Sequence, residues 1–151
     1  MSHFLEGRKT RGDRGAALVE FALVSLIFVF FIYAIAVFGI LLSTKNTVTH
    51  AAAEGARSAL GVPDQPSATL RDRRIAQAAT TVAESLSHLG SNYDPNDTAV
   101  SIDPCGSGDP GDCITVTITY PWDKRPLVPQ APGMGLATPK TIHATAVVRL
   151  N

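Results

Sequence analysis

The longest apolar segment of the chain is residues 16–42, AALVEFALVSLIFVFFIYAIAVFGILL. Of these 27 positions 24 are apolar, and only Glu20, Ser25 and Gly39 interrupt the run. A helix needs about 20 consecutive apolar residues to cross a bilayer, so this segment predicts one transmembrane helix. The remaining 124 residues hold 44 hydrophobic ones and no second run of comparable length. This distribution excludes a multi-span transporter and a cytosolic enzyme with one core built from all 151 residues.

Charge divides along the chain in the same way. Residues 1–15 carry four basic and two acidic side chains, and residues 43–151 carry nine basic and ten acidic ones. Basic residues beside an apolar segment favour the cytoplasmic side, so residues 1–15 are predicted to be a cytoplasmic leader without regular structure and residues 43–151 an extracytoplasmic domain. That domain shows no basic patch with stacking aromatics, which argues against a nucleic-acid partner.

The helix is predicted to continue beyond the membrane. Residues 43–60, STKNTVTHAAAEGARSAL, are rich in alanine and contain no helix breaker, and Gly61 with Pro63 forms the first stop signal. A second helix is predicted over residues 67–89, where apolar residues recur at helical spacing before Gly90.

After this helix the apolar period changes from helical to two. Alternation predicts strands at about 98–103, 113–120 and 141–150, which would form a three-stranded antiparallel sheet with one packed face. The proline-rich segment 121–140 is predicted to be an extended connection. The predicted fold class is therefore α+β and pilin-like: a long transmembrane helix extends into a small domain with a second helix and a sheet.

Cys105 and Cys113 bracket the sequence GSGDPGD between the first two predicted strands. In an extracytoplasmic domain this spacing predicts a disulfide across a tight loop, worth roughly 2.5 kcal/mol in the chain-entropy model. Free thiols remain the alternative. A zinc site lacks further ligands, and Asp103, Asp109 and Asp112 miss the calcium-loop spacing and are expected in turns.

The junction of leader and apolar segment holds the most informative motif, RGDRGAALVEF, at residues 11–21. A secretory signal has a shorter apolar core that ends in a small-residue cleavage site. Here the small residue, Gly15, precedes a run twice that length, an order that suits cleavage on the cytoplasmic face. Glu20 is the only charge in the run, and a carboxylate there is a functional candidate, unless it lies close enough to the headgroups to reach water.

Gly15, Val19, Glu20 and Phe21 at the head of a long apolar helix, together with AAAEGARSAL at 51–60, resemble the TadE-like proteins of tight-adherence (Tad/Flp) pilus systems. The resemblance covers about residues 12–60. It implies a minor pseudopilin, cut by a prepilin peptidase between Gly15 and Ala16. TadF-like proteins share the leader and remain a close alternative.

The resemblance also implies roles and partners. Glu20, with Phe21 beside it, would be needed for processing or assembly, and the partners would be other pilins and pseudopilins, the inner-membrane secretion machinery and the bilayer. Glu54, Gly55 and Arg57 match the motif that ends the shared region. Their other interpretation is structural: the small residues permit close helix approach, and Glu54 and Arg57 form a solvated surface pair.

No enzyme is predicted. The four histidines are scattered, and the sequence lacks HExxH, GxSxG and P-loop motifs, so no catalytic residue, metal ligand or cofactor is assigned. The alternative function is an uncleaved, membrane-anchored binding module in which Trp122 anchors an interface, although Trp122 could equally cap the core.

Overall fold

A computed structural model of the chain describes residues 11–63, 69–106, 111–129, 135 and 137–150. It divides the chain into two units, residues 1–39 and 40–151. The first helix, α1 (Arg11–Ser58), contributes to both units. It continues past residue 42 to Ser58, as the sequence predicts, because alanine-rich residues follow without a helix breaker.

The start of α1 differs from the sequence-based expectation. Residues 11–15, the end of the leader, are helical rather than irregular. Once the apolar segment is helical, each preceding residue joins for one hydrogen bond without a new nucleation cost, so the helix extends backward. The rest of the predicted leader, residues 1–10, lies outside the described residues.

In the second unit one stripe of α1 is buried. Its members recur at spacings of three or four residues and are Leu41, Thr44, Val48, Ala51, Ala52, Gly55 and Ala56. Ala59, just after the end of α1, is also buried. Thr44 satisfies its hydroxyl locally by donating to the carbonyl of Ile40 at 2.8 Å. From Ala51 onward the stripe consists of alanine and glycine, so other elements approach this end of the helix closely.

The second helix, α2 (Leu70–Ser85), packs against this small-residue end. Ala78, Val82 and the following Leu86 form its fully buried face. Residues 67 and 68 of the predicted range are outside the described residues, and α2 ends earlier than residue 89. A short 3-10 helix, η2 (Ser87–Asn92), follows, and Gly90 breaks it with a φ of 56° that glycine adopts without strain.

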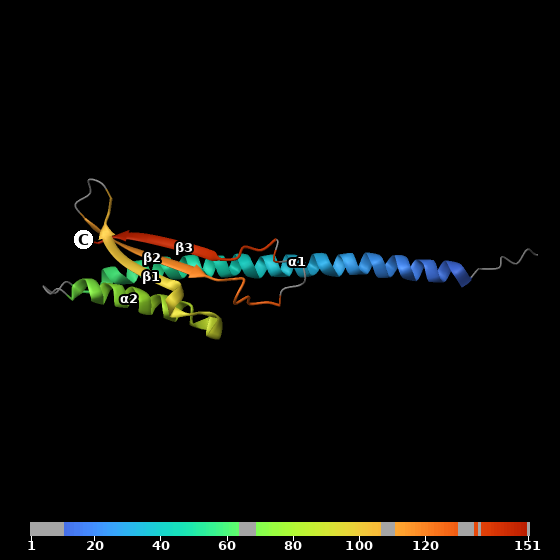
Figure 1. Cartoon of the computed structure of the whole chain (residues 1–151), viewed down its shortest axis with the longest axis horizontal. Helices are drawn as coiled ribbons and strands as arrows, with labels where there is room; N and C mark the ends of the chain where they lie inside the picture. The colour runs from blue at the N-terminus through green and yellow to red at the C-terminus, as the bar shows by residue number, and fades with distance from the viewer. Residues whose placement is uncertain (1–10, 64–68, 107–110, 130–134, 136, 151) are drawn as a thin grey trace, which may run out of the picture. The chain divides into compact units, whose positions relative to one another are not determined.

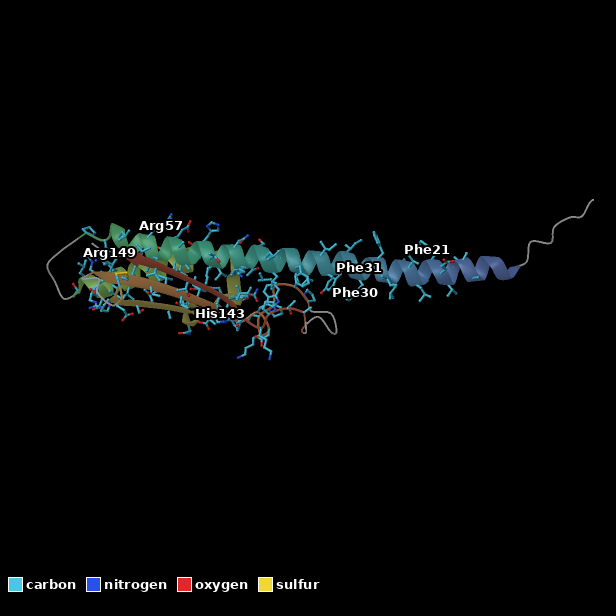
Figure 2. The ribbon with its side chains drawn as sticks, turned by 90° about the horizontal axis from the view of Figure 1, so that it is seen from above. Phe21, Phe30, Phe31, Arg57, His143 and Arg149 are labelled. Carbon is cyan, nitrogen blue, oxygen red and sulfur yellow. A yellow bond between two sulfur atoms is a disulfide. The ribbon has the colours of Figure 1, made fainter. Side chains whose placement is uncertain are left out.

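The sheet has the strand order β1-β2-β3 and is antiparallel throughout. Its strands are β1 (Thr98–Pro104), β2 (Asp112–Tyr120) and β3 (Ile142–Arg149), each within a residue of its predicted start and end. The sheet runs alongside the second half of α1, as Figures 1 and 2 both show. The α+β class with a long helix, a second helix and a three-stranded antiparallel sheet is thus confirmed.

Alternation along the strands places their apolar side chains toward the helices. In β2, Ile114, Val116 and Ile118 are fully buried, and the threonines between them lie on the opposite face. Pairing of Thr117 with Thr145 and of Ile118 with Ala144 carries the same alternation into β3. The single apolar face of the sheet therefore closes the core of the second unit.

Cys105 and Cys113 form the predicted disulfide, with Cα atoms 5.0 Å apart. The bridge lies beside the β1–β2 pairing, in which Asp103 faces Cys113. Residues 107–110 of the connecting loop, including Asp109, are outside the described residues. Among the described residues no cluster of three metal-ligating side chains occurs.

The segment after β2 is held by buried aromatic and ionic contacts. Trp122 is fully buried, with its ring centroid 6.5 Å from that of Tyr120. Arg125 bonds both carboxylate oxygens of Asp97, at 2.6 and 2.7 Å, and its guanidinium lies 5.9 Å from the Tyr120 ring centroid. These contacts tie the connection between β2 and β3 to the turn before β1.

Candidate functional site

Between Leu18 and Ile32 the first unit presents an exposed apolar helix surface. Every large hydrophobic residue described from Leu18 to Ile32 is more than half exposed, Phe21 by 70% and Leu18 by 69%. Figure 2 shows Phe21, Phe30 and Phe31 standing out from α1 at different points along it. A helix that is apolar all round is stable only when lipid or other protein covers it. By length and hydropathy this is one helix able to cross a membrane, and it provides a single-pass membrane anchor.

Glu20 is the only charged residue in this apolar surface. Its side chain is exposed, and it forms no hydrogen bond or ion pair with any residue that the structure describes. The other polar side chain, Ser25, donates to the carbonyl of Ala22 at 3.0 Å and is satisfied within the helix. Glu20 therefore remains a carboxylate without an intramolecular partner among the described residues, and in an apolar environment it requires one from elsewhere.

Gly15 and Ala16 lie one helical turn before Glu20. Both are exposed, and a Cβ placed on Gly15 would meet no atom within 4 Å. No packing contact with described residues thus requires glycine at position 15. Glycine lowers local helix stability by about 1 kcal/mol relative to alanine. The geometry permits a peptidase to reach the bond between Gly15 and Ala16.

The motif Glu54, Gly55 and Arg57, at the end of the segment that resembles TadE-like proteins, has a structural explanation at Gly55. A Cβ on Gly55 would lie 2.5 Å from Cγ2 of Val82 and 3.1 Å from the carbonyl oxygen of Ala78. Only glycine at this position lets α1 and α2 approach so closely.

The expected surface pair of Glu54 and Arg57 is wrong. Glu54 instead accepts a hydrogen bond from the hydroxyl of Ser85 at 3.0 Å, which links it to α2. Arg57 is exposed (Figure 2) and bonds no residue within the described part of the chain. Glu54 lies on the face of α1 that meets α2. The spacing of residues along α1 alone does not reveal this.

Trp122 does not act as a surface anchor. It is fully buried, so of its two predicted roles the structure supports the one in the core. The binding-module hypothesis loses its main side-chain candidate. His143, one of the four scattered histidines, is exposed on the outer face of β3.

Comparison with known families supports the interpretation of the first helix. Residues 15–57 match the model of the TadE-like protein family. The TadE-like resemblance is confirmed. The match begins at Gly15 and ends at Arg57, so it contains both ends of the pattern identified in the sequence. No curated protein and no solved structure matches the chain.

The TadE-like match covers 43 of the 151 residues and leaves α2 and the sheet outside it. The TadE-like family is one of structural pilus proteins rather than enzymes. Together with the membrane-spanning helix, the match indicates a protein associated with a tight-adherence pilus. The TadF-like alternative stays a prediction.

The second unit also contains a cavity that no sequence motif indicates. A cavity of about 260 Å³ lies between α1 and the start of β3. Lys45, Thr141 and His143 are the polar residues that line it. Residue 45 is about 100 positions from the other two, so only tertiary structure brings them together.

Proposed function

We propose that this chain is a minor pseudopilin that takes part in the assembly of a tight-adherence pilus after a prepilin peptidase cuts behind Gly15. One observation carries the proposal: Glu20 lies one turn beyond Gly15, on an exposed apolar helix that begins the TadE-like segment. The peptidase, neighbouring pilins and pseudopilins, and the inner-membrane secretion machinery are the partners.

Cleavage would create a new ammonium group at Ala16. Four residues of helix rise about 6 Å, so this group lies near the Glu20 carboxylate of its own or a neighbouring subunit. An unpaired carboxylate costs about 3 kcal/mol at the bilayer centre on insertion scales, and less near the headgroups, toward which Glu20 lies. Pairing across subunits relieves that cost and sets the axial register of adjacent helices. Phe21, 70% exposed beside Glu20, then packs against the same neighbour.

The orientation follows from charge and from the disulfide. The basic leader stays in the cytoplasm, where the peptidase acts, and residues 43–151 lie outside the cytoplasmic membrane. The disulfide between Cys105 and Cys113 fits an oxidising extracytoplasmic compartment. The mature chain is incorporated in the fibre, caps its tip or stays in the membrane as part of the assembly platform.

Amino-terminal sequencing of the protein from cells that contain the pilus system tests the cleavage. We expect a mature chain that starts at Ala16. In cells without the peptidase this shortened chain should be absent. An intact leader, or a start beyond residue 42, would refute the assignment as a pseudopilin.

A pair of variants tests the role of Glu20. Glu20→Ala should abolish or strongly reduce pilus assembly and leave the second unit folded, because Glu20 is exposed and forms no hydrogen bond or ion pair with a described residue. Ser25→Ala is the matched control, since it removes the other interior polar side chain, whose hydrogen bond is local. Normal pili in the Glu20→Ala strain would remove Glu20 from the mechanism.

A further inference from the structure

The cavity between α1 and β3 combines an apolar wall with hydrogen-bond donors. Leu41 and Leu42 of α1 form part of the wall, and Lys45 lies one turn further along the same helix. Thr141 and His143 line it from the start of β3. None of the residues that line this cavity is acidic, so an anion placed there meets the positive charge of Lys45 and no negative charge from the walls.

The position of the cavity along the chain places it at the membrane surface. Leu41 and Leu42 are the last two residues of the apolar segment 16–42. A helix of 27 residues is about 40 Å long, which is about the thickness of a bilayer with its headgroup layers. The two leucines therefore lie at the level of the headgroups, at the end of the apolar segment that contacts the acyl chains, and Leu42, 59% exposed, faces the surroundings.

His143 is held in place by two hydroxyl groups. Its Nδ1 lies 3.2 Å from Oγ1 of Thr119, and its Nε2 lies 2.9 Å from Oγ1 of Thr141. When Nε2 carries a hydrogen, it donates to Oγ1 of Thr141. The hydroxyl hydrogen of Thr141 is then free to donate to an anion in the cavity, so Thr141 and the Lys45 ammonium can bind the same oxygen-rich group.

We propose that this cavity binds the phosphate and glycerol of an anionic phosphoglyceride from the adjacent leaflet. The phosphate would lie between Lys45 and Thr141, with His143 behind it, and the acyl chains would pass along Leu42. A volume of about 260 Å³ falls just below that of pockets for drug-sized ligands, so it holds a headgroup and not a whole lipid. The site rests on the membrane anchor and not on cleavage at Gly15.

Competitive lipid retention by the full chain tests the proposal. The protein is purified in detergent with equal amounts of phosphatidylglycerol and phosphatidylcholine, and the retained lipids are quantified by mass spectrometry. We expect phosphatidylglycerol to be enriched in the wild type. Lys45→Gln should reduce that enrichment about fivefold, the effect of one basic residue near an anionic surface. His143→Gln should also reduce it.

Lys124→Gln is the matched control. Lys124 is an exposed lysine of the same unit that does not line the cavity. The Lys124→Gln variant should therefore retain the wild-type enrichment. Fluorescence of the buried Trp122 verifies that each variant is folded. Equal losses for Lys45→Gln and Lys124→Gln would mean non-specific attraction and overturn the site, as would a wild type without enrichment.

A competition arm separates a lipid headgroup from free phosphate. Excess inorganic phosphate should leave phosphatidylglycerol bound, because it lacks the acyl chains that contact the apolar wall. Displacement of the lipid by phosphate alone would overturn the lipid assignment.

Discussion

Gly55 of α1 and Val82 of α2 approach so closely that a methyl group on Gly55 would lie 2.5 Å from Cγ2 of Val82. Val82 is fully buried and β-branched, so its side chain has little freedom to move away. The backbone carbonyl of Ala78 bounds the same space at 3.1 Å. This contact joins the TadE-like segment to the part of the chain that the family match does not cover.

Gly55→Ala should therefore destabilise the second unit. Overpacking costs about 1–3 kcal/mol, and the better helix propensity of alanine offsets about 1 kcal/mol of that. Urea unfolding of the full chain in detergent, followed by the fluorescence of Trp122, the only tryptophan, measures the loss. Gly61→Ala is the control, since a Cβ there meets nothing within 4 Å. Equal stability of the two variants would contradict the close contact.

Asp97→Asn should loosen the connection between β2 and β3. Asp97 and Arg125 are only 13% and 25% exposed, and the guanidinium also bonds the carbonyl of Asn92 at 3.1 Å. Loss of a charged acceptor in this setting should cost about 2 kcal/mol in the free energy of unfolding. Asp123→Asn, an exposed acid two residues from Arg125, should change it by less than about 0.5 kcal/mol.

Removal of the disulfide should lower stability by an amount set by its short loop. Cys105 and Cys113 are separated by 8 in sequence, and the chain-entropy model gives about 2.5 kcal/mol. The double variant Cys105→Ser with Cys113→Ser should shift the urea midpoint downward, and chemical reduction of the wild type should give the same midpoint. If reduction and the double variant leave the midpoint of the oxidised protein unchanged, the bridge contributes nothing.

Tyr120 should make stability fall at alkaline pH. Burial raises the pKa of its phenol above 10.0; Arg125 opposes this rise and Asp97 adds to it. Below about pH 10 the phenol is protonated in both states and its contribution is complete. At higher pH the unfolded state ionises first, so stability declines until the raised folded pKa is passed.

A comparison with Tyr120→Phe isolates this dependence. The variant also loses the hydrogen bond that the Tyr120 hydroxyl donates to the carbonyl of Arg125, which lowers stability at every pH. The slope of the unfolding free energy against pH above 10 is therefore the diagnostic quantity, and it should be shallower in Tyr120→Phe. Parallel slopes would show that the Tyr120 pKa is not raised.

Local patterns predicted the secondary structure because their causes are local. Twenty-four apolar residues in 27 produce α1, and the alternation of Ile114, Val116 and Ile118 with threonines produces β2. The Gly15 and Glu20 spacing is also local, which explains why a motif within one helix was enough to identify the TadE-like resemblance. Predictions failed where distant contacts compete with local preference. Glu54 bonds Ser85 and not Arg57 because α2 lies against that face of α1.

The apolar helix, the order of helices and strands, the disulfide and the candidate residues Gly15 and Glu20 could be predicted from the amino-acid sequence, since each depends on neighbours along the chain. The burial of Trp122, the close contact at Gly55 and the cavity that Lys45 shares with His143 become visible only in the folded chain. Those outcomes depend on which surfaces of α1, α2 and the sheet meet. Side chains far apart in sequence fill that space together, and no spacing along the chain encodes it.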